Sequence, residues 1–471
     1  MLLGLTQAIT RETEPSDNLF PPLGIGYIAS YLKKHLNFNN IVIERYSDKL
    51  LSHKPDLIGM TSNTMNFNKA IEIATRVKKE FNAITIVGGP HISLLPKSLP
   101  ECIDIGVMGE GELTAKELFE YFLSEPEAIA KKAINTEKLE KIKGIVFHKN
   151  GQKIVTEERE LIENLDTLPY PDRDLLKGKW INDIGEYAGI NSSRGCPYRC
   201  SFCSTCIFWR KYRGFSADYF VREVRYLHRN YGTKRITILD DLFLVEKDRL
   251  RKIVGRLKEE GLTKKVEFEC TGRIDLLTDE TCKLMKEMNI KSVQLGIESY
   301  NEKVLKEYNK SNINKKTINE ALSFCKKYGL KVYALFIIGA PQETQKDILE
   351  TYVFLRDNMD KMNWVNTGEL LALPGTKYWK MLEEKGKVSP YMNWDLFNSG
   401  EEAIYSEDFP YVSEVLTKDN FYALLLLFKE VTRNYSLRIE KEQIVNTRGY
   451  RALEKVRRVL NKFRKILGIQ L

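Results

Sequence analysis

Uniformly apolar strands that alternate with amphipathic helices constrain the fold of this chain more than any other feature. In the N-terminal part, LLGLTQAI, DLIGMTSNT and AITIVGGPHIS predict strands, and FNKAIEIATRVKKEF has the apolar spacing of a helix. Apolar strands separated by helices form parallel sheets that are covered on both faces. We therefore expect a Rossmann-like, doubly wound domain over residues 1–140.

A second strand–helix series occupies residues 187–385. Six strands are predicted in EYAGINSS, RITILDD, VEFECTGRID, SVQLGIES, KVYALFIIGAP and VNTGELLALPGT, and a helical segment follows each of the first five. This length is too short for eight units, so we expect a partial (β/α)6 TIM-like barrel with its chemistry at the carboxyl ends of the strands. Residues 141–186, with a hairpin at Asn150-Gly151, are expected to form a connector. Residues 386–471 are expected to be mainly helical.

The charge of the chain is concentrated at its C-terminus. The formal net charge is +9, and residues 451–467 carry seven Lys or Arg and one Glu, which gives +6. The rest is close to neutral, which argues against nucleic-acid binding. An apolar stripe runs along the same basic segment, so that helix either packs on the barrel or lies on an anionic membrane surface. With no signal peptide and no membrane-spanning stretch, we expect a cytoplasmic protein, free or attached to a membrane through residues 451–467.

Four of the eight cysteines lie in one short loop, RGCPYRCSFCSTC. Cysteines clustered in a reducing compartment indicate metal binding. A structural zinc site usually divides its ligands between two separate pairs. A four-cysteine cluster of the ferredoxin type uses C-x2-C-x2-C, which does not match the first gap. The spacing is C-x3-C-x2-C-x2-C, at Cys196, Cys200, Cys203 and Cys206.

The first three of these cysteines, with Phe202 before the third, resemble the radical S-adenosylmethionine enzymes. The motifs RITILDDLF, CTGRIDLLTDE, LGIESYNEKVLKEYNK, FIIGAPQET and LLALPGT follow in the order seen in one branch of that superfamily, and PPLGIGYIASYL near the start also fits. That branch carries an N-terminal cobalamin-binding domain. The resemblance implies a [4Fe-4S] cluster with one iron left open for S-adenosylmethionine, and it leaves Cys206 spare. The implied cluster ligands are Cys196, Cys200 and Cys203.

By the same resemblance, residues at the ends of the barrel strands contact S-adenosylmethionine. Asp240 and Asp241 end the second strand, where the family meets the amino group, although adjacent carboxylates also cap helices. Arg273 carries a fork suited to the carboxylate of S-adenosylmethionine, and a surface salt bridge is the alternative. No further catalytic residue is identified. The implied S-adenosylmethionine set is Phe202, Asp240, Asp241, Arg273, Glu298, Gly339 and Pro341.

The cobalamin set is taken from the strand ends of the first domain, because open parallel sheets bind ligands there. The chain lacks the D-x-H-x-x-G motif whose histidine ligates cobalt in mutase-type domains. His91 is the only histidine at a strand end of this domain, and a hydrogen-bonding role is favoured for it over an axial ligand. The residues expected to contact cobalamin are Thr61, Ser62, Gly88, Gly89, Glu110 and Gly111.

The resemblance implies a cobalamin-dependent enzyme that methylates an unactivated carbon or a phosphorus centre after cleaving S-adenosylmethionine to a 5′-deoxyadenosyl radical. One alternative is a non-methylating radical enzyme that forms a carbon–carbon bond or a ring, or rearranges a skeleton, acting on a lipid or natural product. The alternative of a different class is a non-catalytic zinc-binding module. The expected partners are a small-molecule, lipid or peptide substrate and a one-electron donor of the flavodoxin or ferredoxin type, with no nucleic acid.

Overall fold

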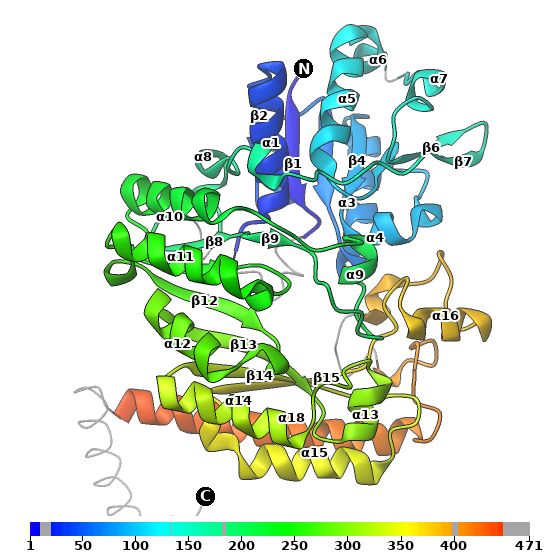
Figure 1. The fold of residues 1–471 in the computed structure, drawn as a ribbon. Coiled ribbons are helices and arrows are strands. Elements are labelled where there is room, and N and C mark those ends of the chain that lie inside the picture. Colours follow the sequence, from blue (N-terminus) through cyan, green and yellow to red (C-terminus); the bar gives the residue numbers. More distant parts are fainter. Residues whose placement is uncertain (10–19, 132, 181–184, 398–403, 446–471) are drawn as a thin grey trace, which may run out of the picture.

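The computed structural model describes residues 1–9, 20–131, 133–180, 185–397 and 404–445. It confirms the predicted fold class: a doubly wound sheet is followed by a six-stranded partial barrel and a mainly helical C-terminal region (Figure 1). The basic segment 451–467 lies outside the described residues, so the interpretation of that segment stays a prediction.

The N-terminal sheet has the strand order β2-β1-β3-β4-β5-β6-β7. Its first five strands are parallel, and the order reverses beside β1, which makes the carboxyl edge there the usual ligand-binding crevice of such sheets. The predicted hairpin at Asn150-Gly151 is formed by β6 and β7, and it continues this sheet because β6 pairs antiparallel with β5. The strands are β1 (Leu3–Gln7), β2 (Ile41–Ile43), β3 (Leu57–Thr61), β4 (Ile84–Gly88), β5 (Ile105–Val107), β6 (Ile145–Lys149) and β7 (Gln152–Val155).

Helices cover both faces of this sheet, as the apolar strands predict. α1 and α5 bury Leu32 and Phe119 in one core cluster, and α3 buries Phe67 and Val77 in another. The helices are α1 (Leu23–Leu36), α2 (Ser47–Ser52), α3 (Phe67–Glu80), α4 (Pro90–Leu94), α5 (Gly111–Ser124), α6 (Pro126–Ala130), α7 (Thr136–Leu139) and α8 (Arg173–Leu176).

The barrel sheet consists of six parallel strands in the order β15-β14-β13-β12-β11-β8. Strands that follow one another in the chain are therefore neighbours, which right-handed β/α units produce. Within the described residues β8 and β15 do not pair, so the barrel is open. The strands are β8 (Tyr187–Ile190), β11 (Arg235–Ile238), β12 (Glu267–Gly272), β13 (Ile290–Glu298), β14 (Lys331–Ile338) and β15 (Trp364–Glu369).

The helices of the barrel, except α11, begin at side-chain caps. Ser216, Thr278, Asn314 and Thr344 each accept a hydrogen bond from a backbone amide in the first turn. Such caps are each worth about 1 kcal/mol. They fix where each strand-end loop stops and its helix starts. The helices are α10 (Ala217–Tyr231), α11 (Lys247–Glu259), α12 (Asp279–Met288), α13 (Glu302–Glu307), α14 (Lys315–Tyr328) and α15 (Gln345–Asp357).

The C-terminal region contains α16 (Lys377–Glu384) and α18 (Lys418–Val445). α18 packs against β15 and α15 at the bottom of the view in Figure 1. Phe421 of α18 fills the space beside Gly339, whose φ is +99°, and a Cβ at this glycine would lie 2.7 Å from the Phe421 ring. Among the described helices, none combines the length and the apolar character needed to cross a bilayer.

Candidate active site

The cysteine loop is closed at its base by a short ribbon. β9 (Ser193–Arg194) pairs antiparallel with β10 (Arg213–Gly214), so that residues 195–212 form one excursion from the strand ends. Gly195 has a φ of +85°, and a Cβ there would lie 2.5 Å from the carbonyl oxygen of Lys211. Only glycine fits this turn, which fixes the backbone directly before the first cysteine.

The tip of the loop is fastened to the segment that follows α13. The backbone N–H of Ser201 donates to the carbonyl oxygen of Tyr308 at 3.1 Å, and its hydroxyl donates to that of Glu307 at 2.9 Å. The amide of Asn309 donates to the carbonyl oxygen of Arg199 at 2.7 Å. The rings of Phe202 and Tyr308 meet edge-on at 5.2 Å. The chain around the second and third cysteines is thus held by a different strand end of the barrel.

The thiols of the loop are half-buried and form no disulfide. Burial raises the pKa of Cys196 to about 11 and also raises that of Cys200, so binding a metal would release protons from them. Within the described ranges, no three metal-ligating side chains converge on a single point. Three thiols on one short loop, with the guanidinium of Arg273 beside Cys200, are donors of the kind that iron–sulfur clusters use.

Arg273 and Tyr198 flank the second cysteine. The guanidinium of Arg273 is buried, and its Nη1 lies 3.4 Å from Sγ of Cys200. Its Nε donates to Asp275 at 2.8 Å, and its Cζ lies 4.0 Å from the centre of the Tyr198 ring. The predicted fork thus lies against the cysteine loop, held from one side by a carboxylate.

A buried ion pair lies at the end of β13. Sequence analysis predicted its acid, Glu298, but not its cation, Lys310. Glu298 follows a bulge and has a φ of +64°. Its Oε1 accepts from Nζ of Lys310 at 2.7 Å, and both side chains are buried. The Lys310 ammonium lies 5.7 Å from the centre of the Phe202 ring, so it links the strand end to the loop. Lys310 lies within the LGIESYNEKVLKEYNK motif, but nothing local in the sequence indicates its partner.

The two adjacent carboxylates after β11, Asp240 and Asp241, have different surroundings and different roles. Asp240 is buried and accepts four hydrogen bonds, from the backbone N–H groups and hydroxyls of Ser192 and Ser193, at 2.5–3.0 Å. Asp241 instead faces a cavity and accepts from the hydroxyl of Thr205 at 3.2 Å. Its removal from bulk water raises the pKa of Asp241 to about 6. Asp240 holds the chain that leads into the cysteine loop, and Asp241 is the carboxylate available to a ligand.

Hydrogen bonds to other protein groups stabilise the turn after β14. The backbone N–H groups of Gly339 and Ala340 donate to Oε2 of Glu343 at 2.6 and 3.1 Å, and the carbonyl oxygen of Pro341 accepts from the backbone N–H of Glu414. Glu343 is fully buried, which raises its pKa to about 7. Gly339 and Pro341 thus lie in a rigid turn built around this acid.

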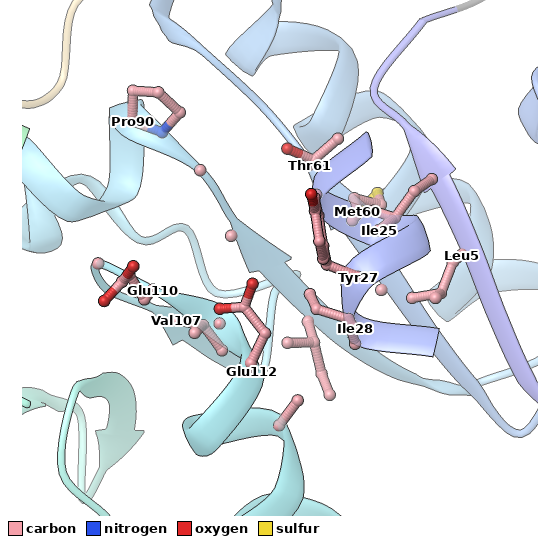
Figure 2. Close-up of a pocket in the computed structure, with 18 of the residues that line it drawn as sticks. Leu5, Ile25, Tyr27, Ile28, Met60, Thr61, Pro90, Val107, Glu110 and Glu112 are labelled. Atoms are coloured by element: carbon pink, nitrogen blue, oxygen red, sulfur yellow. The ribbon is translucent and has the colours of Figure 1, made fainter. Parts of the chain in front are cut away.

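One cavity of about 380 Å³ joins the two carboxyl edges. Figure 2 shows the side chains of α1 on one side of it and Glu110 and Glu112 on the other. Five of the six residues expected to contact cobalamin line it, while Ser62 is buried and its hydroxyl bonds Asn66 at 2.9 Å. Sequence analysis found little of the barrel side of the cavity, because most of those residues lie in or beside the cysteine loop and not at the ends of the predicted barrel strands. They are Asn191, Arg194, Ser204, Thr205, Phe208, Trp209 and Asp241, of which only Asp241 was predicted.

His91 is packed in the core and does not line the cavity. Its Nδ1 lies 3.3 Å from the hydroxyl oxygen of Thr64, and its Nε2 lies 3.1 Å from that of Ser98. The ring stacks on Phe67 at 3.8 Å, and burial lowers the pKa of His91 to about 3. Both ring nitrogens are therefore engaged by hydroxyls, and the histidine is a neutral hydrogen-bonding residue.

Comparison with known families agrees with this two-part site. Residues 190–355 match the model of the radical SAM superfamily, and residues 14–119 match that of the B12 binding domain. The two matched regions meet at the cavity, since the first contains the cysteine loop and the second contains all six predicted cobalamin contacts. The fold and the site thus define a radical S-adenosylmethionine protein with a cobalamin domain.

Individual relatives extend over most of the chain. An uncharacterised methyltransferase of Pyrococcus horikoshii is 31% identical over 418 residues, covering 84% of this chain and 85% of the relative. An anaerobic magnesium-protoporphyrin IX monomethyl ester cyclase of Rubrivivax gelatinosus is 28% identical over 409 residues, covering 81% and 71%. The solved structure of the cobalamin-dependent radical enzyme OxsB is similar in fold, with a TM-score of 0.68, 18% identity and coverage of 99% of this chain and 71% of that one.

The chain belongs to the branch of the radical S-adenosylmethionine superfamily that carries an N-terminal B12-binding domain. It is an enzyme whose cofactors are a [4Fe-4S] cluster, S-adenosylmethionine and cobalamin. Family membership removes the alternative of a non-catalytic zinc-binding module.

Proposed function

We propose that this enzyme transfers a methyl group to an unactivated carbon or a phosphorus centre of a small molecule, as a cobalamin-dependent radical methyltransferase. The observation that carries the proposal is the shared cavity, which is lined by the glycine-rich edge of the B12-binding domain and by the residues that follow the third cysteine. Methyl transfer to a substrate radical needs the radical source and the methyl donor to face one space. The methyltransferase relative, similar over most of both chains, favours the same outcome.

The residues present fit the two cofactors. Gly24 and Gly109 have open space where a Cβ would point, so the cavity wall leaves room for a bulky ring system. Cys196, Cys200 and Cys203 are proposed to hold the cluster, and Thr61, Gly88, Gly89 and Gly111 to contact cobalamin. When bound, the cluster and cobalamin supply the electron transfer and methyl chemistry that side chains cannot.

The protein's own contribution is binding, orientation and the exclusion of water. Asp241 faces the cavity with a pKa of about 6, so it is mostly ionised at neutral pH and suits the amino group of S-adenosylmethionine. Arg273 presents its guanidinium beside Cys200 and suits the carboxylate. We also assign contacts with S-adenosylmethionine to Phe202, Glu298, Gly339 and Pro341, although none of these four lines the cavity that Asp241 faces.

A first test counts metals and products. Protein reconstituted without oxygen with iron, sulfide and hydroxocobalamin should hold about four irons and one cobalt per chain. With a reductant it should convert S-adenosylmethionine to 5′-deoxyadenosine. Cys200→Ala should lose iron and cleavage, while the matched variant Cys206→Ala should keep both. Cleavage retained in Cys200→Ala would refute the assigned ligand set.

The product pattern separates methylation from the alternative. A methyltransferase that uses S-adenosylmethionine as its methyl source also releases S-adenosylhomocysteine. The cyclase relative makes a non-methylating radical enzyme the second candidate. Cobalt binding with 5′-deoxyadenosine but no S-adenosylhomocysteine, under turnover with cell-extract metabolites, would favour that candidate.

Partners, location and domain limits belong to the same proposal. The cleavage of S-adenosylmethionine consumes one electron, so a donor of the flavodoxin or ferredoxin type is required. The eight unpaired cysteines suit the reducing cytoplasm. We divide the chain at residues 140, 186 and 385, with the β6–β7 hairpin attached to the first part by its pairing with β5.

A further inference from the structure

A buried ion-pair cluster joins the B12-binding domain to the cysteine loop. The Arg194 guanidinium donates from Nη1 to Oε1 of Glu110 and from Nη2 to Oε1 of Glu112, each at 2.5 Å. Arg213, across the β9–β10 ribbon, donates to Oε2 of Glu110 at 2.9 Å. All four side chains are buried. Burial alone would raise the pKa of Glu110, but the two arginines hold it below its ordinary value, so the carboxylate is charged.

Both ends of this ion-pair cluster lie beside residues that would hold cofactors. Arg194 is separated from Cys196 only by Gly195, whose backbone is fixed by close contact with Lys211. On the other side, Glu110 and Glu112 flank Gly111, which lines the cavity at the start of α5. A displacement at the ion pairs therefore reaches a ligand of the iron–sulfur cluster through one residue, and it moves the cavity wall directly, because Arg194, Glu110 and Glu112 line the cavity themselves.

Aromatic rings fix the orientation of the guanidinium. Its Cζ lies 5.4 Å from the centre of the Tyr27 ring and 5.5 Å from that of Trp209. Tyr27 comes from α1 of the B12-binding domain and Trp209 from the end of the cysteine loop, and both line the cavity. The planar fork of arginine serves two carboxylates and two ring faces at once, which a lysine ammonium cannot do.

We propose that Arg194 is a positioning residue that locks the cysteine loop onto the B12-binding domain and thereby sets the separation and orientation of cluster and cobalamin. The inference rests on the proposed function, because it requires both cofactors. Its role is geometric: both Nη atoms of the guanidinium are paired with Glu110 and Glu112, and we assign it no contact with a reacting atom. Reacting centres tolerate little error, since a displacement of about 1 Å can cost about 100-fold in rate.

The distance between the cofactors tests this directly. Pulsed electron paramagnetic resonance on protein holding the reduced cluster and Co(II) cobalamin gives the distribution of that distance. Arg194→Lys should retain iron and cobalt but shift the distribution by on the order of 1 Å, or broaden it. Glu112→Gln, which leaves the Glu110 contacts in place, should give a smaller change in the same direction and also serves if Arg194→Lys fails to fold.

Arg210→Lys is the matched control, because Arg210 lies in the same loop and pairs with Glu158 in an exposed ion pair at 2.7 Å. It should leave the distribution unchanged. An unchanged distribution in Arg194→Lys with both metals bound would overturn the inference while leaving the proposed function intact. Wild-type protein that binds iron but no cobalt would instead refute the proposed function, and the inference with it.

Discussion

The carboxyl edges of the N-terminal sheet and of the barrel face the same cavity but are lined by different kinds of residue. The N-terminal edge offers Gly88, Gly89 and Gly111 with apolar neighbours from α1. The barrel edge carries Asp241 at the cavity, and it also carries the buried acids Asp240 and Glu298, which do not line the cavity and are already paired with protein groups. One edge makes room for a large ligand, and the other presents preorganised polar groups. A larger side chain should therefore impair ligand binding at the N-terminal edge. Removal of a charged partner should impair stability at the barrel edge.

The largest expected effect comes from filling the N-terminal side. Gly24 lies on α1, lines the cavity and has nothing within 4 Å of a built Cβ. Gly24→Phe should abolish cobalt binding without lowering stability, because glycine is a poorer helix former than phenylalanine by roughly 0.5 kcal/mol. Gly255 of α11 is equally open, so Gly255→Phe is the control. Metal analysis should show iron unchanged in both variants, and full cobalt loading of Gly24→Phe would place cobalamin elsewhere.

The next largest effect is expected from removing a charged partner on the barrel edge. Lys310→Met leaves Glu298 buried without its cation, which should cost about 3–5 kcal/mol in the free energy of unfolding. Adding Glu298→Gln should recover much of this loss. Lys258→Met breaks an exposed pair with Glu287 and should cost less than about 1 kcal/mol. Urea unfolding measures all three, and equal losses in the two lysine variants would show that the buried pair carries no special weight.

A pH dependence follows from the acid in the turn after β14. Because the pKa of Glu343 is raised to about 7, the folded state holds a proton that the unfolded state releases near 4.5. The contribution of Glu343 to stability should therefore fall as pH rises between these values, by about 3 kcal/mol. Glu343→Gln keeps an acceptor for the Gly339 and Ala340 amides and should flatten this dependence. Unfolding at pH 5 and pH 8 tests it, and the same slope in both proteins would contradict the assignment.

The smallest effect on cofactor binding is expected at His91. His91→Gln should leave cobalt content unchanged, since the ring bonds hydroxyls and does not line the cavity. With a pKa of about 3, the folded histidine resists the proton that the unfolded chain accepts near 6.5. The contribution of His91 to stability should therefore fall by about 2 kcal/mol between pH 6.5 and 5, so the stability difference between wild type and variant should change by that amount over this range. Loss of cobalt on this substitution would restore His91 as a candidate ligand.

Local pattern was sufficient for the fold class and for much of the site. The apolar strands and the helices between them predicted both sheets, because a strand that is buried on both faces is apolar at nearly every position. The strand ends followed from the same pattern, so Thr61 and Gly88 could be placed at the carboxyl edge of the first sheet and Asp241 at that of the barrel. The cysteine spacing is likewise local, since one short loop must supply all the thiolates.

Partners distant in the chain could not be predicted in this way. Glu110 and Arg194 are 84 residues apart, and nothing near either residue indicates that they meet. The different roles of Asp240 and Asp241, and the burial of His91 between Phe67 and Trp394, depend equally on packing between elements. The sequence by itself determined the two sheets, their ligand-binding edges and the cysteine loop. Only the tertiary structure decided which charges face the cavity and which bind one another, because these pairings join residues that are distant in the chain and meet only when the elements pack.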